Sequence, residues 1–282
     1  MPDGLTAPPQ DLIDAARYPL ADAAARARIV AAGRKGLAHE GCAMLPRFVT
    51  PAGTAAMAAE AMRLLPRSNR RDLQLCAYAN QSADGFPADH PRRRVSPFRQ
   101  HVIGADDFAP DGPVMRLYRW DGLTRLVADL LELPALHRVA DPLLSCNVTI
   151  MGEGDQHGWH FDSNDFVVSL LLQAPERGGH FVFAPGIRSE SDPNYDRVAR
   201  ALDGDPAVLR MPEVSPGTLA LFRGKHSIHR VTPIEGARPR IIALFSYDRR
   251  PDMNFTERSR MNVLGRSRPR AATAQTAGGK GT

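Results

Sequence analysis

The sequence is poor in cysteine, in aromatic residues and in long apolar runs. Its three cysteines, Cys42, Cys76 and Cys146, are scattered, so they form neither a disulfide framework nor a zinc-binding pattern and suit a reducing cytoplasm. The longest apolar runs, such as VVSLLLQ and RIIALFSY, have the length of strands and are far too short for a membrane span. The N-terminal stretch MPDGLTAPPQDLIDAARYPL has no basic segment followed by an apolar one. We therefore expect a cytoplasmic protein with no signal peptide and no membrane partner.

The charge balance is moderately basic. Lysine and arginine together number 36 against 31 aspartate and glutamate residues, which gives a formal net charge of +5. Arginine clusters occur in RSNRR (67–71), PRRR (91–94) and RSRPR (266–270). Such clusters are typical of a solvated surface, and they also attract anionic small molecules. No interleaved aromatic residues or nucleic-acid-binding motif accompany them, so we expect a small-molecule partner and no nucleic acid. The oligomeric state stays open.

The pattern of the chain changes near its middle. Alanine content and apolar spacing predict helices over 21–35, 51–65 and 121–133. After Pro142, short apolar or alternating runs broken by glycine and proline predict strands, namely LLSCNVTIM, VVSLLLQ, HFVFAP, TLALFR and RIIALFSY. The segment ERGG (176–179) is expected to be a hairpin turn between two of them. The fold class predicted is mainly β with N-terminal helices (α+β), with a β-sandwich or barrel as its core.

We expect one domain over 21–265. It would comprise a helical part at 21–141 with one short strand in CAMLPRFV, a β-core at 142–250 and a C-terminal capping segment at 251–265. The N-terminus, 1–20, and the small, polar and basic tail, 266–282, are expected to be poorly ordered.

The segment GWHFDSND carries the first sign of a metal site. His160 and Asp162 are two residues apart, so on an extended chain their side chains point to the same face. A third ligand is offered downstream in GKHSIHRVTPIEG, where His229 leads directly into the bend and His226 is the competing candidate. Two histidines and one carboxylate on one face leave three coordination positions open, which suits non-haem Fe(II) and O2 chemistry.

An arginine inside an apolar strand supports this interpretation. In RPRIIALFSY, Arg238 and Arg240 lie on the same face, and a buried arginine needs a partner such as a carboxylate. Arg240 is placed to hold the distal carboxylate of 2-oxoglutarate, with Arg238 as the alternative anchor. A metal-binding module without a cosubstrate would need no such arginine.

The combination of H-x-D, a distal histidine and an arginine on the last core strand resembles the Fe(II)/2-oxoglutarate-dependent oxygenases. The segments NDFVVSLLLQAPERGGHF, GTLALFRGKHSIHRVTPIEG and ALFSYD are similar to the branch of carrier-independent amino-acid (lysine) halogenases and hydroxylases. The resemblance covers roughly 142–250. It implies a double-stranded β-helix (jelly-roll, cupin-like) core, with iron held by His160, Asp162 and His229 and with 2-oxoglutarate held by Arg240.

One residue decides the reaction that the resemblance implies. The halogenases replace the ligand carboxylate with a small residue so that chloride can bind iron, whereas this chain keeps Asp162. We therefore expect a dioxygenase that hydroxylates an unactivated C–H bond of a free amino acid or similar small polar metabolite, with succinate and CO2 as co-products. The same chemistry on a nucleotide or other phosphorylated molecule, and a non-catalytic cupin-like module, remain alternatives. Desaturation and cyclisation also stay open as outcomes.

Further polar residues are candidates for binding the small molecules. On the strand SCNVTIM, Asn147 or Thr149 is expected to hydrogen-bond 2-oxoglutarate. His157 and Asn164 flank the ligand motif and could reach the substrate, and Arg99 could clasp a substrate carboxylate or phosphate.

Overall fold

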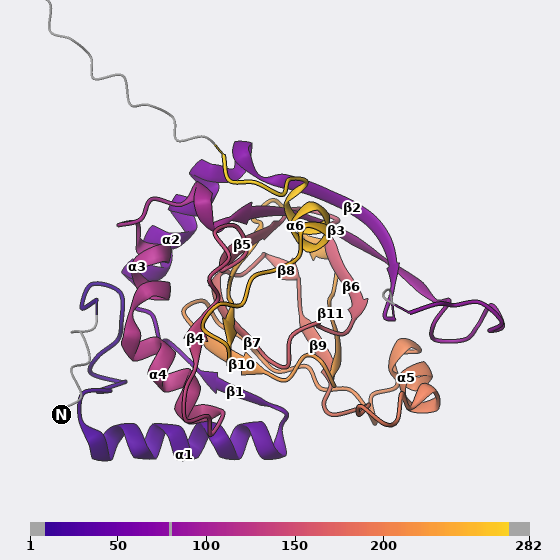
Figure 1. The fold of residues 1–282 in the computed structure, drawn as a ribbon, viewed down its shortest axis with the longest axis horizontal. Coiled ribbons are helices and arrows are strands. Elements are labelled where there is room, and N and C mark those ends of the chain that lie inside the picture. The colour runs from indigo at the N-terminus through magenta and orange to yellow at the C-terminus, as the bar shows by residue number, and fades with distance from the viewer. Residues whose placement is uncertain (1–8, 79–80, 271–282) are drawn as a thin grey trace, which may run out of the picture.

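The computed structural model describes residues 9–78 and 81–270, which form an antiparallel β-barrel with most of its helices on one side (Figure 1). The helices are α1 Ala23–His39, α2 Pro51–Leu64, α3 Pro113–Arg119, α4 Asp121–Leu130, α5 Tyr195–Leu202 and α6 Glu257–Leu264, with short 3-10 turns at Leu65–Arg67 and Ala105–Asp107. The strands of the main sheet are β1 Cys42–Leu45, β2 Asn69–Cys76, β3 Val95–Gly104, β5 Cys146–Met151, β6 Gln156–His160, β7 Val167–Gln173, β9 Phe181–Ala184, β10 Leu219–Phe222, β11 Ile228–Val231 and β13 Arg240–Phe245. Two small sheets pair β8 Arg177–Gly178 with β12 Ile234–Glu235, and β14 Tyr247–Asp248 with β4 His137–Arg138.

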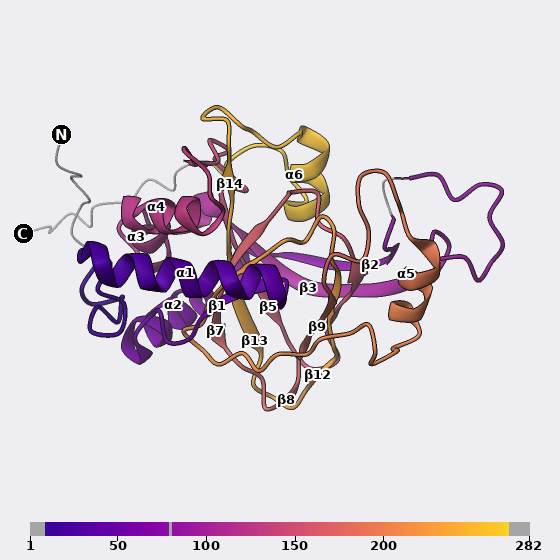
Figure 2. The ribbon, with the colours of Figure 1, turned by 90° about the horizontal axis from the view of Figure 1, so that it is seen from below.

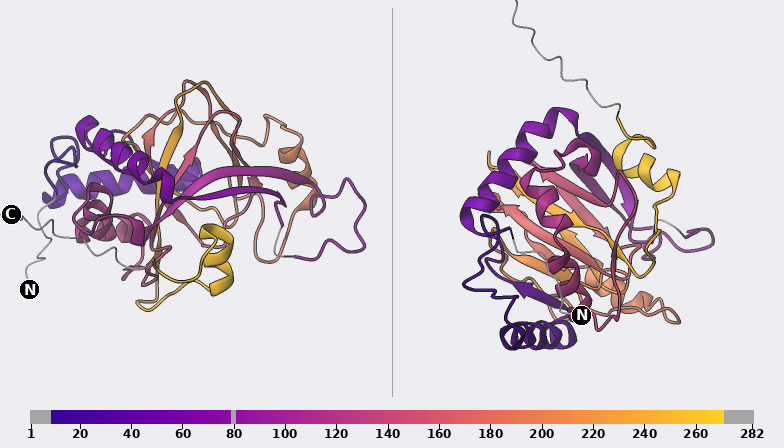
Figure 3. Two further views of the ribbon diagram at one scale, coloured as in Figure 1. Left: turned by 90° about the horizontal axis from the view of Figure 1, so that it is seen from above. Right: turned by 60° about the vertical axis from the view of Figure 1, so that its left-hand side comes forward.

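The main sheet runs in the order β1-β10-β7-β13-β5-β3-β6-β11-β9, and β2 pairs with β3. The ten-residue strand β3 joins the two halves, because β5 pairs with its end at 101–104 while β6 pairs with 98–99. Consecutive strands β5 and β6 thus lie along one strand and lead into opposite halves of a double-stranded β-helix. Figure 3 shows β2 and β3 as a long ribbon across the front of the barrel. The jelly-roll core predicted from the sequence is confirmed.

Alternation along the strands separates a packed face from a cavity face. On β5, β7 and β13, one set of side chains joins the hydrophobic core under the helices: Cys146, Val148, Ile150, Val168, Leu170, Leu172, Ile241, Ala243 and Phe245. Most of the intervening residues point the other way and line a cavity between the two halves of the barrel. Helices α1 to α4 lie on the packed side, whereas α5 lies at the opposite end of the molecule (Figures 1 and 2).

The predicted helices form for local reasons that the sequence shows. The Asp22 side chain accepts a hydrogen bond from the Ala25 N–H at the start of α1, and Thr50 caps α2 ahead of Pro51. The helix predicted at 121–133 is α4, whose apolar face packs into the core. None of the helices in the described ranges is long and apolar enough to cross a bilayer.

The structure corrects the expected division of the chain. The β-core is not confined to 142–250, because β1, β2 and β3 precede it in the chain and belong to the main sheet, with β3 at its centre. The ERGG segment is not a hairpin between β7 and β9, which do not pair with each other; it forms β8, paired with β12. Gly178 and Gly179 do take positive φ values of 67° and 63°, as the turn chemistry requires.

The expectation of poorly ordered ends can be compared with the structure only for 9–20 and 266–270. Residues 1–8 and 271–282 lie outside the described residues. Within the predicted loose N-terminus, Leu12 and Ile13 are buried and Ile13 forms a β-bridge with Val49. Within the predicted tail, Arg266 donates to both Asp106 and Asp107. Apolar anchors in one case and an ion-pair cluster in the other fasten these segments to the domain.

Candidate metal centre

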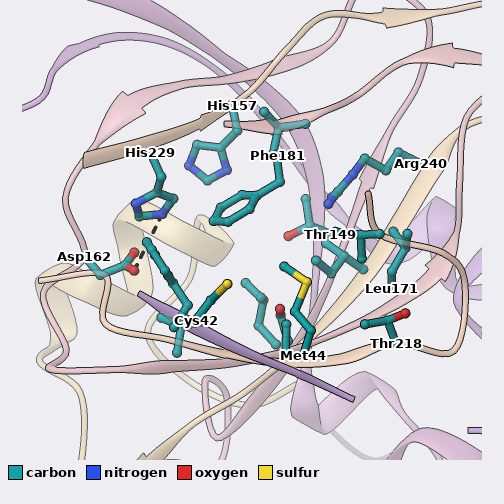
Figure 4. Close-up of a pocket in the computed structure, with 18 of the residues that line it drawn as sticks. Cys42, Met44, Thr149, His157, Asp162, Leu171, Phe181, Thr218, His229 and Arg240 are labelled. Atoms are coloured by element: carbon teal, nitrogen blue, oxygen red, sulfur yellow. Dashed lines mark ion pairs between the residues drawn. The ribbon is translucent and has the colours of Figure 1, made fainter. Parts of the chain in front are cut away.

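Three potential metal ligands meet at one end of the cavity. His160 ends β6 and His229 lies in β11, and the antiparallel pairing sets the two residues directly opposite each other. Asp162 follows two residues after His160. Its Oδ1 lies 3.7 Å from His160 Nε2, and its Oδ2 lies 3.6 Å from His229 Nε2. One donor atom from each residue lies within 4.8 Å of the others, so a single ion could contact all three. Figure 4 shows Asp162 facing His229.

Backbone contacts fix both imidazoles in the orientation that a metal needs. Nδ1 of His160 lies 2.8 Å from the Gly158 carbonyl oxygen, and Nδ1 of His229 lies 3.0 Å from that of Ser227. A carbonyl only accepts, so each Nδ1 carries the proton and each Nε2 presents a lone pair to the gap. Burial lowers the pKa of His160 to about 3 and that of His229 to about 4, so both rings are neutral at neutral pH.

The Asp162 carboxyl completes a donor set that fits Fe(II). Its Oδ2 is buried, and no hydrogen-bond partner for this atom lies among the described residues. Burial raises its pKa, with the nearby His160 acting in the opposite direction. An orphaned carboxylate oxygen is costly unless a cation meets it. Two neutral imidazole nitrogens and this oxygen are the facial ligand set of non-haem iron sites.

His226, the competing histidine of the sequence, lies outside this cluster. It is half-exposed, and its Nε2 lies 3.8 Å from Glu190 in a surface ion-pair group. The geometry therefore favours His229 as the third ligand.

Arg240 lies on the side of the cavity away from Asp162 and His229 (Figure 4). It is only 4% exposed, and the described residues offer its guanidinium neither a carboxylate nor a hydrogen bond. Burial lowers its pKa to about 10, so it remains a cation at neutral pH. Arg238, the alternative, is exposed and donates to the Pro175 carbonyl instead. It precedes β13 and does not line the cavity, although the sequence placed both arginines on one face.

The other predicted binding residues divide into those inside and those outside the cavity. Thr149 lines it, whereas Asn147, two residues earlier on β5, does not. His157 lines it too, with its ring stacked on that of His160 at 4.2 Å and 8°. Asn164 is half-exposed in the loop after the ligand motif and is not part of the cavity wall.

The prediction for Arg99 conflicts with the structure. Its neighbour Phe98 points inward, with its ring 4.7 Å from that of His157. Successive side chains of a strand point to opposite faces, so Arg99 faces outward, where it is half-exposed and its Nε lies 3.8 Å from Asp72 Oδ1. Arg99 is therefore not placed to clasp a substrate in this cavity.

Arg71 and Gln100 are inward-facing polar residues that the sequence analysis missed. Gln100 lies on the same face of β3 as Phe98, and Arg71 is its partner on β2. Arg71 Nε and Gln100 Oε1 are buried without a hydrogen-bond partner among the described residues. Burial lowers the pKa of His157 well below its ordinary value, with smaller effects in the same direction from His160, His229 and Arg71. The alternation in NRRDLQLC could have indicated this, but RSNRR was interpreted as one surface cluster.

Comparisons with known proteins agree with this geometry. A family model described as Halogenase D matches residues 25–263, and no curated protein matches. Similar solved structures include the non-heme alpha ketoglutarate dependent epimerase SnoN from nogalamycin biosynthesis, at 17% identity and a TM-score of 0.54, covering 80% of this chain and 84% of that one. AviO1 from Streptomyces viridochromogenes Tue57 is 17% identical with a TM-score of 0.53, covering 78% of this chain and 96% of its own. The non-heme alpha ketoglutarate dependent carbocyclase SnoK from nogalamycin biosynthesis is 15% identical with a TM-score of 0.52, covering 86% and 93%. The chain belongs to the Halogenase D family, and its core has the fold of the Fe(II)/2-oxoglutarate-dependent oxygenases, the superfamily that its sequence predicted.

Proposed function

We propose that this protein is an Fe(II)/2-oxoglutarate-dependent dioxygenase that hydroxylates an unactivated C–H bond of a free amino acid or a similar small polar metabolite. The observation that carries the proposal is the pairing of a buried His-Asp-His cluster with an unpaired buried arginine across one cavity. Fe(II) bound with 2-oxoglutarate and O2 would supply the C–H oxidation, with succinate and CO2 as co-products. His160, Asp162 and His229 would hold the iron.

Arg240 is the residue proposed to bind 2-oxoglutarate. A dicarboxylate suits a cavity with a cation on one side and a metal cluster on the other, because each of its negatively charged ends would meet a positively charged partner. Thr149 lines the same cavity and offers a hydroxyl. A bare metal-binding module would leave the buried charge of Arg240 uncompensated, so the arginine argues against the non-catalytic alternative.

Asp162 is the residue that favours oxygen transfer over halogen transfer. Its carboxylate faces both histidines and occupies the position that a halide ligand would need. A negative charge there also repels a halide. The family model carries the name of a halogenase, and the carboxylate at 162 is the reason to propose a hydroxylase for this chain.

The polar residues beside the metal cluster favour an anionic substrate group. His157 lines the cavity, and the inward-facing Arg71 and Gln100 each keep a buried polar atom unpaired within the described chain. A carboxylate would satisfy the arginine as acceptor. We therefore propose His157 as the substrate-binding residue in place of Arg99; Arg71 and Gln100 do not themselves line the cavity, and we propose them as polar support beside it.

The arginine cluster 91–94 gives no support to the nucleotide alternative, because its members are already engaged. Arg92 donates to the Ser82 carbonyl, Arg93 to the Phe86 carbonyl and Arg94 to Asp203. They fasten the connection between β2 and β3 and are not free to hold phosphate.

An anaerobic Fe(II) titration with 2-oxoglutarate tests the proposal. We expect the weak visible absorption band of the iron chelate with the wild-type protein and none with His160→Ala. A screen of amino acids and nucleotides for substrate-dependent succinate release then identifies the substrate class. Metal binding without any effect of 2-oxoglutarate would instead support a cupin-like binding module, and a chlorinated product from the wild-type protein would refute the hydroxylase assignment.

A further inference from the structure

Gly224 lies directly against the carboxylate of the metal cluster. It is buried in the turn between β10 and β11, and its carbonyl accepts a hydrogen bond of 3.1 Å from the Asp162 N–H. A methyl group built on Gly224 would overlap Asp162 Oδ2 and would lie 2.5 Å from Cγ and 2.9 Å from Cβ. All three of its nearest neighbours are therefore atoms of one side chain.

The backbone does not require glycine at this position. Gly224 is not among the residues with positive φ, so an alanine could adopt its conformation without strain. The space filled by the Asp162 carboxylate is the only close steric constraint among its nearest contacts. Oδ2, the oxygen that a methyl would displace, is the same atom that faces His229 Nε2 at 3.6 Å.

We infer that Gly224 is a positioning residue for the metal site: its missing side chain holds open the notch in which the Asp162 carboxylate faces the two histidines. This inference rests on the proposed function, because it assumes that Asp162 is a metal ligand. A side chain at 224 would push the carboxylate out of the notch and leave two histidines to hold the ion. Positions 162 and 224 thus share one space, which only one side chain can occupy.

The test is a double-mutant cycle with Co(II), measured by calorimetric titration without O2. Gly224→Ala should weaken Co(II) binding by about 10- to 100-fold, the range for losing the support of a metal ligand. Asp162→Gly should weaken it similarly. In the double variant Asp162→Gly/Gly224→Ala, the methyl has lost the atoms that it would strike, so its affinity should lie within about twofold of Asp162→Gly.

Thermal melting gives a second readout that holds even if Gly224→Ala folds poorly. The single variant should have a lower Tm than the wild type because the methyl overpacks the notch, and adding Asp162→Gly should restore it. Gly152→Ala is the matched control, because its methyl would have no atom closer than Asp155 Oδ2 at 4.0 Å and the position needs no positive φ. This control should leave both Co(II) affinity and Tm unchanged.

The possible failures are distinguishable. If Asp162→Gly weakens binding but Gly224→Ala binds Co(II) like the wild type, the inference alone is overturned. If Gly224→Ala weakens Co(II) binding equally with and without Asp162, the substitution acts independently of the carboxylate, and the inference is again overturned. If Asp162→Gly itself binds Co(II) like the wild type, Asp162 is no ligand, and both the inference and the proposed site are overturned.

Discussion

Replacing Arg240 by methionine should stabilise the protein in the absence of 2-oxoglutarate. It should also strongly reduce the stabilisation that added 2-oxoglutarate provides. Arg240 is 4% exposed and has no partner among the described residues, so the free protein bears the cost of burying its charge. Burial lowers its pKa by more than two units from the ordinary arginine value, to about 10. At about 1.4 kcal/mol per pKa unit, this shift corresponds to a destabilisation of up to about 3 kcal/mol. Because the folded state binds the proton less tightly, the cost is present at every pH below about 10 and disappears as the arginine deprotonates above it.

The size of the expected change follows from these values. Arg240→Met keeps the apolar length of the side chain and removes the charge, so the Tm of the metal-bound protein should rise by several degrees, at about 2–4 °C per kcal/mol. A wild-type protein with 2-oxoglutarate at a hundredfold its Kd should gain about 2.7 kcal/mol of stability. The variant should gain less than about 1.4 kcal/mol, because a lost charge-assisted carboxylate contact weakens binding at least tenfold.

Differential scanning calorimetry without O2, in the presence of Mn(II) and with or without 2-oxoglutarate, measures both effects. Arg238→Met is the control, because Arg238 is exposed and bonds only to the surface near Pro175. It should melt and respond like the wild type. A lower Tm of free Arg240→Met would show that the guanidinium has a stabilising partner, and an undiminished shift with 2-oxoglutarate would remove Arg240 from the cosubstrate site.

Three further outcomes follow from the site. His229→Ala should abolish Fe(II) binding while His226→Ala retains most of it, as measured by equilibrium titration, and the reverse result would exchange their roles. Asp162→Gly should lose most hydroxylation and yield little or no chlorinated product in high chloride, as measured by mass spectrometry; undiminished hydroxylation would remove Asp162 from the iron. Burial raises the pKa of the Cys42 thiol to about 11, so iodoacetamide at pH 8 should leave Cys42 unmodified while the half-exposed Cys76 reacts. Cys42 lines the cavity, so its rapid alkylation, located by peptide mass spectrometry, would show that the cavity wall opens.

The sequence was sufficient for the features that depend on short-range alternation. His160 and Asp162 share a face because two residues separate them on an extended chain, and the pairing of β6 with β11 brings His229 opposite His160. Arg240 was recognisable because a cation inside an apolar strand needs a special reason.

The features that the sequence analysis missed or misplaced depend on strand register and on tertiary contacts. Arg99 and Arg71 both lie on strands, but only the pairing with β6 shows that Phe98 points inward, which sends Arg99 outward and brings Arg71 to the inner face. Strand β2 escaped prediction because NRRDLQLC is charged and pairs along only one edge. Glycine is required at 224 because of Asp162, a residue 62 positions earlier in the sequence, so no local sequence pattern indicates this requirement.

The shared space at positions 162 and 224 also governs the order in which evolution can change this site. The step Asp162→Gly is sterically open at any time, because it only empties the notch. Once that step has occurred, the atoms that a methyl at 224 would strike are gone, and alanine can be accepted there. After such a substitution, restoring the aspartate alone would meet an occupied notch, so the first reversion must occur at 224. Within a lineage, the loss of the carboxylate is therefore a single mutation, whereas its recovery is contingent on a second site, and ancestral reconstruction of this family should treat the two positions as one epistatic pair.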